Sequence, residues 1–198
     1  LHSFWFAEAI EAFEGVLARD PSCAMAHWGI ALSQWGNPFA GLRAPQQIER
    51  GRAAIEQALK TGSPSPRERG YIQAAAELFS DGQAATQRAR TLAYERAMDQ
   101  VARANPDDME ARIFHALAIN QTADASDQTY AQQRRAASIL EPLFLEHPAH
   151  PGLAHYIIHA YDHPPLAEKA LVAARRYASL APAIPHALHM PSHTFTRV

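Results

Sequence analysis

The sequence predicts an all-α fold, and three observations support this prediction. Ala, Leu, Glu, Gln and Arg are abundant, and these residues are strong helix formers. Runs of alternating β-branched residues, which would indicate strands, are missing. Apolar residues recur at spacings of three and four, as on the buried face of a helix. Apolar residues make up 47% of the chain and charged residues 19%, which suits a packed core and excludes disorder.

Caps and helix breakers divide the chain into about ten helices joined by short loops, which favours an antiparallel array. The first helix is expected over residues 3–19, where Ala9, Phe13 and Val16 share one face. The pair Asp20-Pro21 ends it. The later helices are expected over residues 23–35, 45–59, 66–79, 84–103, 109–119, 130–145, 153–161, 166–180 and from 186 to the end.

Four helices end in one pattern of three apolar or small residues followed by proline. It occurs at Ala9-Phe13-Val16-Pro21, Tyr94-Met98-Val101-Pro106, Ala136-Leu140-Leu143-Pro148 and Ala170-Ala174-Tyr177-Pro182. Pro148 and Pro182 are 34 residues apart, the length of a tetratricopeptide helix–turn–helix repeat. We therefore predict a tetratricopeptide-like, right-handed α-solenoid, with an irregular helix pair at about residues 37–82, where the period is lost. A helical bundle without true repeats is the alternative.

Four segments resemble a group of bacterial tetratricopeptide-repeat (TPR) proteins of unassigned activity: residues 1–6, 20–29, 150–156 and 185–193. The resemblance covers nearly the whole chain and implies the repeat fold without supplying a reaction. The length suits a single domain over residues 1–198. Members of the group often carry an N-terminal export signal and further repeats, and this chain begins at Leu1 rather than Met. We therefore expect a segment of a longer protein, either cytoplasmic or exported.

Composition excludes several classes of function. The formal net charge is -2, so no basic excess supports nucleic-acid binding. A single cysteine, Cys23, excludes an internal disulfide and a cysteine-built zinc site. No apolar stretch approaches the roughly 18 residues that a membrane span needs. Neither a glycine-rich phosphate loop nor a catalytic pair of carboxylates is evident, so whether the protein is an enzyme stays open.

Histidine is the residue that points to chemistry: the chain has 11, and most of them lie at or after His147. In the TPR family, a fixed set of first-helix positions faces the concave wall. Counting from the prolines that begin the last two repeats places five histidines on that set, and four of them pair one repeat apart: His155 with His189, and His159 with His193; the fifth is His186. Residues four apart share a helix face, with Cβ atoms about 5–6 Å apart. Four imidazoles on two neighbouring helices can therefore converge on one metal ion, which we predict they bind.

Three further residues are candidates for completing or supporting this site. Asp162 lies three residues after His159 and is expected to be a ligand or to orient a ligating ring. His186 and His163 are additional candidate ligands. Imidazole suits zinc, copper or iron, so the ligand type leaves the metal open. If only three histidines coordinate, a water can take the fourth position, and metal-dependent hydrolysis or oxidation becomes an alternative function.

The histidines have other interpretations. The same side chains can form a metal-free polar wall that binds a peptide, a protein partner or a small ligand, or can be purely structural. His147 and His150 flank a proline in a turn and are expected to be solvated. Pro191 lies inside the last helix, and a break there would turn His189 and His193 away from a common face.

An aromatic group near the other end of the chain is a second candidate binding surface. Trp28, Leu32 and Trp35 fall on groove positions and can bind an apolar or planar ligand. The alternative is that they pack against the irregular section over residues 36–82.

Overall fold

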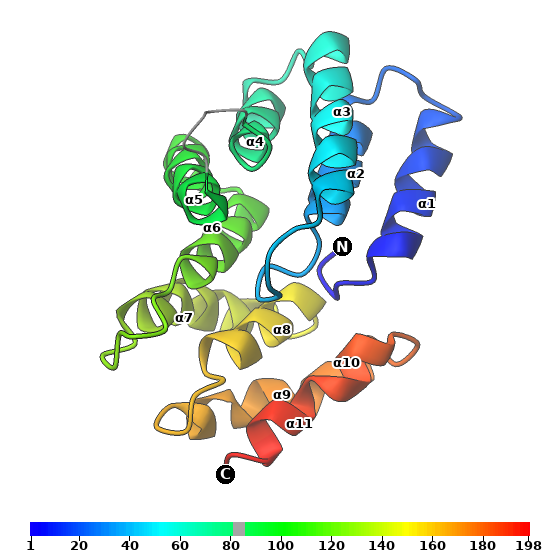
Figure 1. Cartoon of the computed structure of the whole chain (residues 1–198). Helices are drawn as coiled ribbons and strands as arrows, with labels where there is room; N and C mark the ends of the chain where they lie inside the picture. Colours follow the sequence, from blue (N-terminus) through cyan, green and yellow to red (C-terminus); the bar gives the residue numbers. More distant parts are fainter. Residues whose placement is uncertain (81–85) are drawn as a thin grey trace. The chain divides into compact units, whose positions relative to one another are not determined.

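The computed structural model describes residues 1–80 and 86–198, and all regular structure in these residues is helical (Figure 1). The prediction of an all-α fold is confirmed. The elements are α1 (Phe6–Leu17), α2 (Ala24–Trp35), α3 (Pro45–Thr61), α4 (Pro66–Glu77), α5 (Gln87–Ala104), α6 (Met109–Gln121), α7 (Ala131–Glu146), α8 (Pro151–Ala160), the 3-10 helix η1 (Ala167–Ala170), α9 (Leu171–Leu180), α10 (Pro185–His189) and α11 (Pro191–Phe195).

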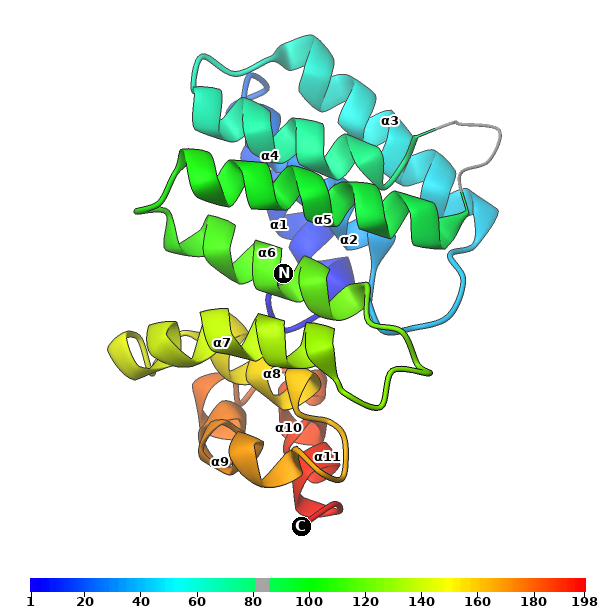
Figure 2. The ribbon, with the colours of Figure 1, turned by 90° about the vertical axis from the view of Figure 1, so that its left-hand side faces the viewer.

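The helices pack as two compact units, in each of which successive helices pack against one another (Figures 1 and 2). Unit 1 contains Leu1 and Ser3–Pro106, with α1 on α2, α2 on α3 and α4 on α5. Unit 2 contains His2 and Asp107–Val198, with α6 on α7, α7 on α8 and α8 on α9. In a repeat array each helix pair contacts mainly the neighbouring pairs. A division into two units is therefore compatible with a repeat fold. The expectation of a single domain stays a prediction.

The ends of the helices follow the capping signals in the sequence. Ser65 and Asp108 accept hydrogen bonds from the N–H groups of residues three positions later, which caps α4 and α6. The expected helix over residues 3–19 was too long: it begins at Phe6, because Phe4 takes a left-handed φ of 54° that a right-handed helix excludes. The expected start of another helix at residue 84 lies outside the described residues.

Two expected helices near the C-terminus are divided. The segment over residues 166–180 begins as the 3-10 helix η1 before α9 continues it. The last helix is divided into α10 and α11, separated by Met190, whose φ of -56° and ψ of -36° remain helical. Because Met190 keeps the helical backbone, the interruption at Pro191 does not turn His189 and His193 to different sides.

Helix α8 is the buried element of unit 2, and it positions the candidate site. It packs against α7 and α9, and eight of its ten residues are buried. Its buried residues include Leu153, Tyr156 and Ile158, so α8 is fixed on several faces at once. A histidine on α8 is therefore held in a low-dielectric environment, whereas histidines on α10 and α11 lie nearer to solvent.

Among the described residues, no helix combines the length and apolar character that crossing a membrane requires.

Candidate functional site

Five histidines from α8, α10 and α11 lie together in unit 2. Helix α8 contributes His155 and His159, four residues apart, whose ring centroids are 4.7 Å apart. The Nε2 atom of His155 lies 3.0 Å from the Nε2 atom of His186 on α10. One ring nitrogen from each of His155, His159 and His186 lies within 4.8 Å of the others. We call these three residues the histidine triad; its spacing allows three imidazoles to approach one ion.

The ring of His155 is held in a defined orientation. Its Nδ1 lies 2.6 Å from the backbone carbonyl oxygen of His2. A carbonyl oxygen only accepts hydrogen bonds, so Nδ1 carries the hydrogen and the neutral ring presents the lone pair of Nε2 to His186. The ring also stacks on Tyr177 of α9, with centroids 5.0 Å apart and an interplanar angle of 11°. One ring nitrogen donates a hydrogen bond to a carbonyl and the other faces the cluster, which is an arrangement typical of metal-binding histidines.

The electrostatics of the triad favour neutral imidazoles. Burial lowers the pKa of His155 well below its ordinary value, against an opposing effect of the hydrogen bond to His2. Burial, followed by the neighbouring histidines, likewise lowers the pKa of His159 well below its ordinary value. The pKa of His186 is lowered by burial and by its electrostatic interaction with the neighbouring His189 and His193. All three rings are therefore neutral at pH 7, which is the form that binds a metal.

The remaining two histidines form a pair of their own. The Nε2 atoms of His189 and His193 are 2.9 Å apart. The Nδ1 of His193 lies 2.9 Å from Oδ2 of Asp162, which follows α8 in the chain. The other oxygen of Asp162, Oδ1, accepts a hydrogen bond of 2.6 Å from Nε of Arg197. Asp162 therefore orients the ring of His193, one of the two roles expected for it.

The arrangement differs in detail from the four-histidine set that the spacing predicts. The structure brings His155 and His159 together with His186, which was expected as an additional ligand, while His189 and His193 lie beside them as a separate pair. Spacing of four residues finds both helical pairs, but it does not distinguish His186 from His189, one turn apart. The assignment of metal ligands itself stays a prediction.

His163 lies away from the triad. Its Nε2 is 3.3 Å from Nε2 of Gln133, and its ring lies against Tyr130, with centroids 4.7 Å apart. Both partners belong to the start of α7 or the residue before it. The structure therefore does not bring His163 to the position of an additional ligand.

The sequence does not predict that His2 packs into unit 2. Glu110 lies between two imidazoles: its Oε1 accepts a 2.9 Å hydrogen bond from Nε2 of His150, and its Oε2 lies 2.9 Å from Nε2 of His2. The Nδ1 of His2 lies 3.1 Å from the hydroxyl of Tyr156. A Cβ at Gly152 would lie 2.6 Å from Nδ1 of His2, so only glycine leaves room for the ring.

The expectation that His150 is solvated is wrong, because only 16% of its side chain is exposed. Its Nδ1 accepts a 3.3 Å hydrogen bond from the N–H of Leu153, which caps α8, so its Nε2 carries the hydrogen that it donates to Glu110. Burial raises the pKa of Glu110, but hydrogen bonds from His150 and His2 outweigh this and lower it well below its usual range. The ligand atoms of His2, Glu110 and His150 also lie close enough together to hold a metal ion. Their contacts with one another indicate a structural role instead, which is to hold His2 in place.

The aromatic residues near the other end of the chain lie in the core of unit 1. Trp28, Leu32 and Trp35 are all buried. Trp28 meets Tyr71 edge-on with ring centroids 5.5 Å apart, and Trp35 meets Phe79 at 5.8 Å. The structure matches the alternative in which these side chains pack against the section over residues 36–82.

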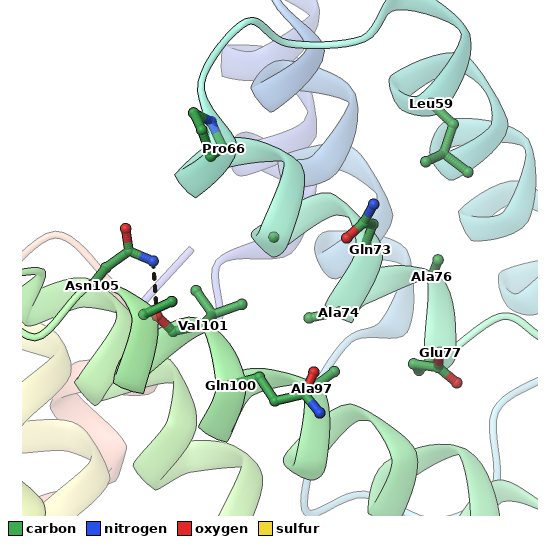
Figure 3. Close-up of a pocket in the computed structure, with 12 residues that line it drawn as sticks. Leu59, Pro66, Gln73, Ala74, Ala76, Glu77, Ala97, Gln100, Val101 and Asn105 are labelled. Carbon is green, nitrogen blue, oxygen red and sulfur yellow. Dashed lines mark hydrogen bonds between the residues drawn. The ribbon is translucent and has the colours of Figure 1, made fainter.

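A hollow of about 630 Å³ lies in unit 1 between α4 and α5 (Figure 3). Small apolar residues line it, among them Ala74, Ala97 and Val101. Amide side chains from both helices also line it, namely Gln73 on α4 and Gln100 on α5. No pattern in the sequence indicates this surface, because its residues are common types without distinctive spacing.

Neither a protein-family model nor a curated protein sequence matches this chain. Among solved structures, the fold is similar to that of YrrB, described as a TPR protein with an unusual peptide-binding site. The TM-score is 0.51 and the sequence identity 16%, over 94% of this chain and 84% of that chain. A likeness at this identity establishes the fold alone. The chain has the fold of a tetratricopeptide-like helical repeat array, as the 34-residue spacing of its prolines predicted.

Proposed function

We propose that this protein is a binding module that holds a divalent transition metal ion at the histidine triad, His155, His159 and His186. The observation that carries the proposal is the meeting of three ring nitrogens within 4.8 Å, one of them on a ring whose other nitrogen is bonded to the carbonyl of His2. Two ligands at about 2.0–2.1 Å from a tetrahedral ion lie about 3.3 Å apart. The 3.0 Å between the Nε2 atoms of His155 and His186 needs only a small opening to reach this separation.

The donor set narrows the chemistry of the ion. Three neutral imidazoles suit zinc, copper, iron or nickel and do not suit calcium or magnesium, which prefer oxygen ligands. Three protein ligands leave a coordination position for water or a bound molecule. A metal-dependent hydrolase or oxidase is therefore an extension of the proposed function, because a water on that position would be activated by the ion.

Removing one ligand tests the site. His186→Ala takes away an imidazole that is half-buried at the edge of the triad, so we expect the tightly bound ion to be lost while the fold persists. Elemental analysis of tag-free protein, purified without chelators, measures the metal content. His147→Ala is the matched control, since His147 is exposed and outside the triad, and it should retain the ion. Equal metal content in both variants, or metal below about 0.2 per chain in the unchanged protein, would refute the proposal.

The pH at which the ion is released is a second test. Because burial lowers the pKa values of His155 and His159, protons compete with the metal only at a pH below the ordinary imidazole value of about 6.5. We expect binding to be constant from pH 8 to about pH 6 and to be lost below about pH 5. The absorption of bound Co²⁺ between pH 8 and pH 4 measures this. Release of the ion already at pH 6.5 or above would contradict ligation by buried, neutral imidazoles.

The hollow between α4 and α5 favours a second candidate function, the binding of a peptide. Amide side chains on both helices can pair with the N–H and C=O groups of an extended peptide, above a floor of small apolar residues. The similarity to YrrB, described as having an unusual peptide-binding site, is compatible with this role. The partner would then be a peptide or a segment of another protein.

Blocking the hollow tests this second function. Ala97 lines the hollow, and Ala97→Arg would fill it with a long charged side chain. A pool of capped, uncharged heptapeptides should shift the side-chain amide resonances of Gln73 and Gln100 in the unchanged protein and leave them unshifted in this variant. Ala89→Arg, at an exposed position on the same helix, is the control and should bind as before. Absence of shifts at millimolar peptide would exclude the hollow as a peptide site.

A further inference from the structure

We propose that His189 and His193 hold a second metal ion beside the histidine triad, so that the cluster is a two-ion centre with one buried and one solvent-facing position. This inference rests on the proposed function, because it adds an ion to the same group of histidines. The second ion would be a divalent transition metal, with water on the positions that the protein leaves open.

The geometry of the His189–His193 pair suits an ion. The two histidines lie four residues apart on α10 and α11, and the helical backbone of Met190 keeps them on one side. Their Nε2 atoms are 2.9 Å apart and their ring planes are at 90°, so the two nitrogens point at a common region. Without a metal, two imidazole nitrogens at this distance share one hydrogen. An ion can take the place of that hydrogen when the hydrogen of His189 moves, through water, from Nε2 to Nδ1, so that both rings stay neutral and both Nε2 atoms present lone pairs. The pair then opens to the roughly 3.3 Å expected of two tetrahedral ligands.

Asp162 orients the ring of His193. The carboxylate of Asp162 only accepts, so Nδ1 of His193 donates to it across 2.9 Å, and Nε2 of the neutral ring carries the lone pair. A carboxylate behind an imidazole is the arrangement that fixes the tautomer and raises the basicity of metal-binding histidines. Arg197 holds the other oxygen of Asp162 at 2.6 Å, which keeps the carboxylate in place behind the ring.

The His189–His193 pair lies next to the histidine triad and nearer to solvent. The ring centroids of His186 and His189 are 6.3 Å apart, so the two sets of ligands adjoin on α10. The side chain of His193 is 31% exposed and His189 is exposed, whereas His155 is completely buried. Two protein ligands on a surface bind an ion more weakly than three in a buried site, and they leave more of its coordination sphere to water.

Metal titration of the full chain tests the inference. Calorimetry and native mass spectrometry with Zn²⁺ at pH 7.5 should show two ions per chain, the second at least tenfold weaker. The double variant His189→Ala/His193→Ala should bind only the tight ion, and His186→Ala should keep the weak ion. Asp162→Asn should weaken the second ion about 10- to 100-fold and leave the first unchanged, since removing a partner behind a ligand has effects of this size. His147→Ala should keep both.

Each other outcome overturns the inference in a distinguishable way. One ion that is lost in His186→Ala but kept in the double variant would leave the proposed function intact and refute the second site. One ion that is lost in either variant would show a single site shared by all the histidines. Binding of no ion to the unchanged protein would refute both proposals. Circular dichroism of each variant shows whether it has folded, and the exposed position of His189 makes loss of the fold unexpected.

Discussion

The hydrogen bond from Nδ1 of His155 to the carbonyl oxygen of His2, 2.6 Å long, is the interaction on which the candidate site depends. It connects two residues far apart in the sequence, and it places the single hydrogen of the neutral, buried His155 ring on Nδ1. The residue that supplies the acceptor, His2, is itself held in place. Its ring contacts Glu110 and the hydroxyl of Tyr156, and a side chain larger than glycine at position 152 would collide with it. These contacts hold His2 in place, and its carbonyl oxygen in turn keeps the hydrogen of His155 on Nδ1 and leaves Nε2 to face the cluster.

Burial keeps the imidazoles of the cluster uncharged, and uncharged imidazoles can bind a cation. Several imidazoles this close together would repel one another if protonated, and the buried position of His155 makes its charged form costly. Each neutral imidazole has one ring nitrogen with a lone pair, and a transition-metal cation is the ligand that such nitrogens stabilise best. Asp162, Arg197 and the exposed histidines give the outer part of the cluster a more polar environment, so the same chemistry there operates in contact with water.

Local features were predictable from the sequence, and features that depend on packing between distant segments were not. The 34-residue spacing and the capping residues predicted the helical repeat fold, and the spacing of four found the pairs His155–His159 and His189–His193. The rotation of α10 about its axis decides which of its two histidines faces α8. The sequence does not contain this rotation, so it could not show that His186, rather than His189, joins His155 and His159. The contact of His2 with α8 spans 153 residues, and no local pattern indicates it.

The protonation state of His155 tests this account most directly, because it depends on the hydrogen bond to His2 and requires neither a metal nor a partner. Long-range ¹H–¹⁵N correlation spectra of the histidine rings, recorded on the metal-free protein at pH 7, distinguish the two neutral tautomers. The account predicts a neutral His155 with its hydrogen on Nδ1 and an unprotonated Nε2. A hydrogen on Nε2, or a doubly protonated ring, would contradict it.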